Sequence, residues 1–264
     1  MNYDHYHGLK ISRENRILTI TLDRPEAKNA VNPQIHGEFA QIFYDIDRDP
    51  ETDVVVITGA NNAFSAGGDI DWLLDIHGDP VATSAAIIND RKIQNSLLDL
   101  EKPIIAKVRG PAIGVGCSIA LFCDFIYATP DAKFADPHVS VGLVAGDGGA
   151  VIWPQLIGYA RAKRYLLTGD FIDGATAESY GLITEAVADQ DLDATVQAMA
   201  ERMAGGAQFA IKWTKSSINA GLKQIANVII DRAAAFENMT MMTEDHKIAV
   251  EAFKNRKKPV FKHR

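Results

Sequence analysis

The sequence predicts an α/β fold that ends in a helical C-terminal region. In the first two-thirds of the chain, short β-rich runs alternate with stretches of helical periodicity. From Leu192 onward the strand pattern stops and only helical periodicity follows. No repeat and no low-complexity linker interrupts the chain. We therefore expect an α/β core at residues 1–191 and a helical region at residues 192–264.

The first predicted elements are a strand and the helix after it. Leu18, Ile20 and Leu22 alternate with threonines, which predicts a half-buried edge strand. Asn32 and Pro33 are typical of an N-cap followed by the first helical residue. Helical spacing then relates five apolar residues: Ile35, Phe39, Ile42, Phe43 and Ile46. These signals predict an amphipathic helix.

Two continuous apolar runs predict strands that are buried on both faces. They lie at residues 54–57 and 104–108, and each ends at a turn signal. A helix is expected between them at residues 85–100. Further strands are expected at 125–128 and 182–187, with helices near 148–167. In the C-terminal region we expect helices at 208–220, 225–242 and 243–255.

Composition limits the classes of function. The chain has 264 residues, of which 47% are hydrophobic, enough for a large core. Its formal net charge of −7 argues against a general nucleic-acid surface, although residues 253–264 are rich in Lys and Arg. No apolar run approaches the roughly 20 residues that span a bilayer. Without a signal-peptide pattern at the N-terminus, a cytoplasmic location is expected.

The two cysteines do not indicate a metal or redox site. Cys117 and Cys123 are six residues apart inside an apolar run, which matches neither a zinc motif nor a CxxC pair. We expect buried free thiols and no metal ion.

Two glycine-rich segments are the main chemical signal. Residues 63–70 (AFSAGGDI) and 110–118 (GPAIGVGCS) each follow a predicted buried strand, and the second opens into an apolar helical run. Amides at a helix N-terminus have no partner within the helix and favour negative charge. Two such N–H groups can stabilise an oxyanion. Tight turns are the alternative, and neither segment contains a phosphate-binding GxGxxG or GxxxxGK[ST] motif.

Five segments in register resemble the crotonase (enoyl-CoA hydratase/isomerase) family: Leu22–Ala30, Ala63–Ile70, Gly110–Asp124, Leu166–Asp170 and Lys258–Lys262. Their order and spacing match across nearly the whole chain. The resemblance implies a crotonase-like spiral of ββα units and a C-terminal region that mediates trimerisation, often into a hexamer built as a dimer of trimers. It also implies an acyl-CoA substrate and no cofactor, with coenzyme A present only as part of the substrate.

The resemblance further assigns site residues. The oxyanion-hole amides fall on Ala66 and Val115, where the second position is usually glycine. The residues implied to contact the coenzyme A or the acyl group are Ala27, Lys28, Gly67, Gly68, Asp69, Ile70, Gly114 and Ser118. Phe261 and Lys262 resemble family residues that reach the coenzyme A of a neighbouring subunit, although a solvated charge run is the alternative for the lysine.

The catalytic positions depart from the family pattern. Hydratases of the family use two glutamates to hold water and transfer protons, but here Ser118 and His138 occupy those positions. Asp147 lies nine residues after His138, between two glycines. A carboxylate beside a histidine fixes its tautomer and raises its basicity. We therefore expect His138 and Asp147 to form the acid/base pair, with helix capping as the alternative role of Asp147.

The stretch from Pro137 to Pro154 is also similar to the β-diketone hydrolase branch, typified by 6-oxocamphor hydrolase. That branch uses a His–Asp pair, but its further histidine near the second glycine-rich segment has no counterpart here. The leading hypothesis is an acyl-CoA enzyme of the hydratase/isomerase type. A carbon–carbon bond hydrolase of a β-diketone is the first alternative, and a catalytically silent acyl-CoA-binding protein is the second.

Overall fold

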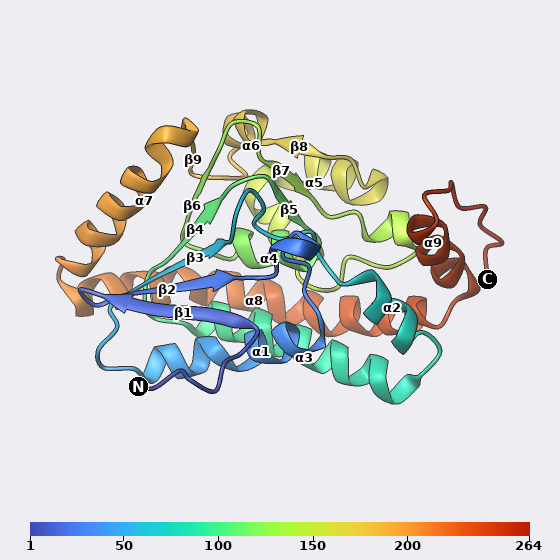
Figure 1. The fold of residues 1–264 in the computed structure, drawn as a ribbon, viewed down its shortest axis with the longest axis horizontal. Coiled ribbons are helices and arrows are strands. Elements are labelled where there is room, and N and C mark those ends of the chain that lie inside the picture. Colours follow the sequence, from blue (N-terminus) through green and yellow to red (C-terminus); the bar gives the residue numbers. More distant parts are fainter.

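The computed structural model describes all residues, 1–264, as two sheets surrounded by helices (Figure 1). The larger sheet has six strands in the order β1-β2-β3-β4-β6-β9. Only β1 and β2 are antiparallel, and the other pairs are parallel. Its strands are β1 (Leu9–Glu14), β2 (Ile17–Leu22), β3 (Val54–Gly59), β4 (Ile104–Val108), β6 (Phe125–Ala128) and β9 (Glu185–Ala186).

The smaller sheet has the order β5-β7-β8, and its first two strands are parallel. These strands are β5 (Pro111–Ile113), β7 (Lys133–Ala135) and β8 (Ile172–Asp173). The chain passes from β4 to β5 and from β6 to β7, so it contributes to each sheet in turn. An isolated bridge between Ser65 and Ala112 places the segment after β3 beside β5 in the same way. This repeated path forms the expected spiral of ββα units.

The helices cover both faces of the larger sheet. In order they are α1 (Pro33–Arg48), α2 (Ile70–Ile76), α3 (Pro80–Asp99), α4 (Val115–Leu121), α5 (Gly149–Thr168), α6 (Gly174–Tyr180), α7 (Asp189–Ala204), α8 (Gln208–Met241) and α9 (Glu244–Lys254). Two short 3-10 helices, η1 (Pro25–Ala27) and η2 (His138–Val141), lie in the connections. None of the helices has both the length and the apolar character needed to cross a bilayer.

The first four residues of β3, Val54–Ile57, are all apolar because this strand is packed on both faces. Val55 and Ile57 belong to the main core, which includes the apolar side of α1. Val54 and Val56 pack on the opposite side in a second cluster with residues of α7. Because both faces of the strand are covered, each position must be apolar.

Most predicted elements are confirmed, and three differ. The strand at 18–22 is not at the edge, because β1 pairs with β2 outside it through residues 9–14, which carry few apolar side chains. The two helices expected at 208–242 form the single helix α8. The strand expected at 182–187 keeps only Glu185 and Ala186 as paired residues. Asn32 caps α1 as expected, since its side chain accepts a hydrogen bond of 2.9 Å from Ile35 N.

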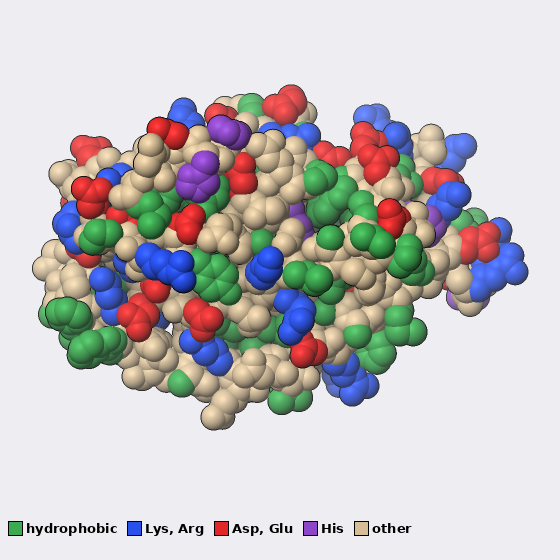
Figure 2. Space-filling view, turned by 90° about the horizontal axis from the view of Figure 1, so that it is seen from below, with side chains coloured by type: hydrophobic (Ala, Val, Ile, Leu, Met, Phe, Trp, Pro, Cys, Tyr) green, Lys and Arg blue, Asp and Glu red, His purple; other side chains and the backbone are tan.

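The surface carries charges of both signs. On the face in Figure 2, acidic and basic side chains are interspersed with hydrophobic ones, and basic groups gather at the end where Figure 1 places α9 and the C-terminus. There, Lys262 and Arg264 pair with Glu244 at the start of α9. The end of the chain therefore packs against the start of α9.

Candidate active site

A cavity of about 360 Å³ lies where the two glycine-rich segments, η2 and α8 meet. Its walls are mainly apolar, and the side chains of Trp72 and Phe253 belong to them. The polar residues in its lining are mostly acidic or histidine, and no Lys or Arg is among them. The cavity therefore combines an apolar wall with a small polar group, as ligand sites commonly do.

The two glycine-rich segments touch through their backbones. Ile113 N donates to Ser65 O at 3.0 Å. Gly67 has φ +91°, and a Cβ there would lie only 3.0 Å from Ile113 O. A Cβ on Gly116 would lie 2.4 Å from the Ser65 Cβ. The glycines are thus needed both for the turn and for the close approach of the two segments.

The prediction that Ala66 supplies an oxyanion N–H is wrong. Ala66 N donates to Lys28 O at 2.9 Å, which ties this segment to the residue after η1. Beyond the turn at Gly67, the N–H of Gly68 has no acceptor, and Gly68 lines the cavity. The N–H of Val115, the first residue of α4, is also without an acceptor and is not capped by a side chain. Gly68 and Val115 therefore each bring an N–H without an acceptor to the cavity wall.

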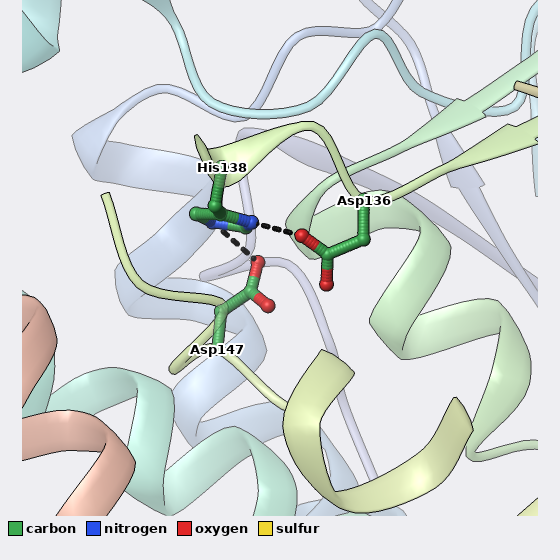
Figure 3. Close-up of side chains that lie close together, drawn as sticks. All are labelled: Asp136, His138 and Asp147. Atoms are coloured by element: carbon green, nitrogen blue, oxygen red, sulfur yellow. Dashed lines mark hydrogen bonds and ion pairs between the residues drawn. The ribbon is translucent and has the colours of Figure 1, made fainter. Parts of the chain in front are cut away.

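His138 stands at the polar end of the cavity, at the start of η2 (Figure 3). Its Nδ1 pairs with Asp136 Oδ1, and the Asp136 side chain is fully buried. Its Nε2 lies 3.3 Å from Asp147 Oδ2 and 3.8 Å from Glu237 Oε1. The structure therefore brings the predicted pair together and adds two further carboxyl groups around the same ring.

Asp147 does not cap the helix that follows it. The N-cap of α5 is Gly148, at φ 130°, and no side chain caps that helix. Asp147 Oδ1 instead accepts a hydrogen bond of 2.9 Å from Ser118 Oγ, and its Oδ2 faces His138. The glycine at 148 lets the chain reverse so that the carboxylate points into the site.

Glu237 was not predicted from the sequence. It lies on α8 with Ile230, Ala233, Ala234 and Met241, which share the buried side of that helix. Its side chain is only 3% exposed. A glutamate in register with a buried apolar stripe is the signal that could have identified it, because buried carboxyl groups are rare without a partner.

Three groups of this cluster, His138, Asp147 and Glu237, have strongly shifted pKa values. Burial lowers the pKa of His138, but Asp147, Asp136 and Glu237 together raise it well above its ordinary value of 6.5. Burial raises the pKa of Asp147 to about 7, although His138 and the Ser118 hydroxyl oppose this. Burial and the negative charge of Asp90 raise the pKa of Glu237 well above its ordinary value. Near neutral pH the cluster therefore holds protons that can be moved.

A second buried pair, His36 and Asp90, also lines the cavity and was not singled out from the sequence. His36 Nε2 lies 2.6 Å from Asp90 Oδ1, and the imidazole ring is 5.0 Å from the Trp72 ring. His36 occupies the same side of α1 as its apolar core residues. This pair places a second group of polar side chains in the cavity wall.

The other predicted contact residues divide into three groups. Gly67, Gly68, Ile70 and Gly114 line the cavity. Asp69 does not, because its carboxylate caps α2 and pairs with Arg24, and Ser118 is buried behind Asp147. For these two, direct contact with the substrate stays a prediction. Ala27, Lys28, Phe261 and Lys262 lie outside the cavity lining, and their coenzyme A contacts stay predictions.

The family model for enoyl-CoA hydratase/isomerase matches residues 12–264. The chain belongs to this family. Crotonyl-CoA hydratase from Syntrophomonas wolfei is 31% identical over 97% of this chain and 98% of its own length. Short-chain-enoyl-CoA hydratase from Clostridium acetobutylicum is 34% identical over 96% and 97%. The protein is accordingly an enzyme of the enoyl-CoA hydratase/isomerase superfamily.

Solved structures of the family show the same fold. An enoyl-CoA hydratase/isomerase from Mycobacterium paratuberculosis has a TM-score of 0.91 at 35% identity, covering 94% of this chain and 99% of its own. A β-diketone hydrolase from the cyanobacterium Anabaena, bound to (S)-3-oxocyclohexyl acetic acid, has a TM-score of 0.84 at 28% identity, covering 90% and 95%. Both enzyme types that the sequence suggested thus occur among the structural relatives.

Proposed function

We propose that this enzyme is a hydrolase that breaks a carbon–carbon bond in a β-diketone by adding water to one carbonyl group. The observation that supports this most is the environment of His138, whose ring lies between Asp136 on one nitrogen and Asp147 and Glu237 on the other. Such a ring can take a proton from water and return it later in the reaction. This proposal places the first alternative of the sequence analysis ahead of the acyl-CoA enzyme.

The position of Ser118 also supports a hydrolase over a two-glutamate hydratase. The family's first glutamate position is occupied by this serine, which is 1% exposed and donates to Asp147. It therefore supports a carboxylate and does not hold water in the cavity. Without two glutamates facing the substrate, the usual addition of water across an enoyl double bond lacks its catalytic groups.

The reaction can be followed atom by atom. Asp136 keeps the proton of neutral His138 on Nδ1, so Nε2 is free to take a proton from water. The hydroxide oxygen bonds to one carbonyl carbon, and the bond from this carbon to the central carbon then breaks. Its electron pair forms the enolate of the second ketone. One water is consumed, and the products are a carboxylic acid and a ketone, or one keto acid from a cyclic diketone.

The free amides of Gly68 and Val115 suit the enolate oxygen. Both residues line the cavity and neither N–H has an acceptor, so both can donate to a negative oxygen as it forms. The central carbon then takes a proton from His138 or from Glu237, whose raised pKa favours its protonated form. His36 and Asp90 lie on the same cavity and can bind a second oxygen of the substrate.

An acyl-CoA substrate is the second candidate. It is supported by the same two amides, because a thioester enolate has an equivalent oxygen, and by relatives of 31% and 34% identity that are named as hydratases. In that reaction the coenzyme A would lie outside the cavity, where Lys28 is exposed.

Labelled water separates the two candidates. The purified protein is incubated in H₂¹⁸O with a cyclic β-diketone or with crotonyl-CoA, and the products are examined by mass spectrometry. We expect ¹⁸O in a new carboxylate of the ring-opened diketone, and loss of this activity in His138→Gln. His7→Gln, an exposed histidine, is the matched control. Label in a hydroxyl group of a CoA thioester, without diketone cleavage, would refute the hydrolase.

We also infer that the protein forms a trimer or a dimer of trimers through its C-terminal helices. Large apolar side chains of α8 are exposed in the single chain, among them Phe209, Trp213, Ile218, Val228 and Met239. Exposed apolar groups of this kind are typical of an interface. Sedimentation velocity measures the assembly, and a monomer at micromolar concentration would exclude it.

A further inference from the structure

We propose that the catalytic pocket binds a zinc ion through His138, Asp147 and Glu237, and that the ion inhibits the enzyme reversibly. One nitrogen and two carboxylates from three parts of the chain are a ligand set that zinc accepts, with a fourth position left for water. In this role zinc is an inhibitor and not a cofactor.

The distances between the ligand atoms suit a tetrahedral ion. Zinc binds nitrogen and oxygen at roughly 2.0–2.2 Å, so two ligands of a tetrahedron lie roughly 3.3–3.5 Å apart. His138 Nε2 and Asp147 Oδ2 are 3.3 Å apart. Glu237 Oε1 is 3.8 Å from the same nitrogen, within the reach of a small side-chain rotation. The His138–Asp147 distance therefore already matches a tetrahedral site, and the Glu237 side chain would move toward the ion.

Each of the two acidic ligands has a carboxyl oxygen without a hydrogen-bond partner in the protein. Asp147 Oδ2 and Glu237 Oε2 are buried and accept no hydrogen bond. Their side chains are 4% and 3% exposed. Buried oxygens normally have hydrogen-bond partners, so these two point to something that enters the site and binds them.

The groups behind these ligands are arranged as in metal sites. Asp136 pairs with Nδ1 of His138, which leaves Nε2 as the ligand nitrogen. Ser118 Oγ donates to the Oδ1 of Asp147, which leaves Oδ2 free. In zinc proteins a carboxylate on the second histidine nitrogen fixes the ring and strengthens the ligand. One ligand atom each of Asp136, His138 and Asp147 lie within 4.8 Å of one another.

Charge favours a divalent cation here. Asp90, Asp147 and Glu237 line the cavity and no Lys or Arg does. On binding, a dication displaces the protons that these carboxyl groups hold and balances the charge that they then carry. Zinc is preferred over Mg²⁺, because Mg²⁺ requires near-octahedral oxygen ligands and keeps several waters.

The inhibition rests on the proposed function, because the ion would occupy the same nitrogen that takes a proton from water. Binding itself does not rest on it. A titration without substrate therefore tests the site even if the enzyme acts on another compound, and a functional diketone hydrolase that binds no zinc would refute only this inference.

The test is isothermal titration calorimetry of the chelator-treated full-length protein with ZnCl₂. We expect one zinc per chain and no comparable heat with MgCl₂. His138→Gln should weaken binding at least about 100-fold, and Asp136→Asn, which removes only the supporting carboxylate, about 10- to 100-fold. His7→Gln should bind zinc like the original protein.

Circular dichroism melting confirms that each variant is folded, and Glu237→Gln replaces His138→Gln if the latter is not. Zinc should also reduce turnover of whichever substrate is active, with recovery on adding EDTA. Absence of zinc binding would overturn the proposal. Binding that is unchanged in both His138→Gln and Glu237→Gln would do so as well, because the ion would then lie elsewhere.

Discussion

Replacing Val115 by proline removes one N–H from the cavity and almost nothing else. Val115 is the first residue of α4, the helix position at which proline is best accepted. Its N–H has no acceptor in the protein, so no internal hydrogen bond is lost. Gly114 before it has φ 51° and ψ −127°, the mirror image of an extended conformation, which glycine adopts without strain.

The size of the expected effect follows from the number of donors. The proposed oxyanion donors are the N–H groups of Gly68 and Val115, two residues of the cavity wall whose amides have no acceptor in the protein. Removing one of two oxyanion donors typically costs about 100- to 1000-fold in kcat, or roughly 2.7–4 kcal/mol of transition-state stabilisation. We therefore expect Val115→Pro to lose two to three orders of magnitude in kcat, with a smaller change in KM.

Val115→Ala is the matched control, because it removes the side chain but keeps the N–H. The assay is initial-rate kinetics on the active substrate class, with thermal unfolding to confirm that both variants are folded. We expect Val115→Ala to retain most of its kcat. If folded Val115→Pro had the kcat of Val115→Ala, the amide would not act on the transition state and the oxyanion assignment would be refuted.

Three further predictions concern the support of the site. Neutral His138 is the proposed base and its pKa is raised well above 6.5, so kcat/KM should rise with pH above neutrality. Asp136→Asn removes a negative charge that favours the imidazolium, and should therefore move this rise in kcat/KM to lower pH by about 1 unit or more. If the pH profile of Asp136→Asn did not move, His138 would not be the group that causes the rise. Gly116→Ala should push the two glycine-rich segments apart, because its Cβ would lie 2.4 Å from the Ser65 Cβ. We expect a lower kcat with an unchanged circular dichroism spectrum. Full activity would mean that the two segments can move apart without disturbing the site. Ser118→Ala removes the 2.9 Å hydrogen bond to the buried Asp147, so urea denaturation should show a loss of about 1.5–3 kcal/mol; an unchanged midpoint would indicate that Asp147 is protonated or has found another partner.

Local patterns predicted most of the fold. The apolar run of β3 predicted burial on both faces, and the structure confirms it with separate packing partners for alternate residues. The Asn32 cap and the end of strand structure before the C-terminal helices were also readable, because hydrogen bonds within a few residues set them. The outer position of β1 could not be predicted from the sequence, because its residues are largely polar.

For the site, too, the sequence predicted some features and left others to the tertiary structure. The sequence by itself determined that two glycine-rich segments follow buried strands, that both usual glutamates are absent, and that His138 and Asp147 are close in the chain. It could not determine that Ala66 N binds Lys28 O while Gly68 N remains free, nor that Glu237 of α8 reaches His138. These outcomes depend on contacts between segments far apart in the chain. Only the tertiary structure decides which polar atoms find partners in such contacts and which are left free for a substrate.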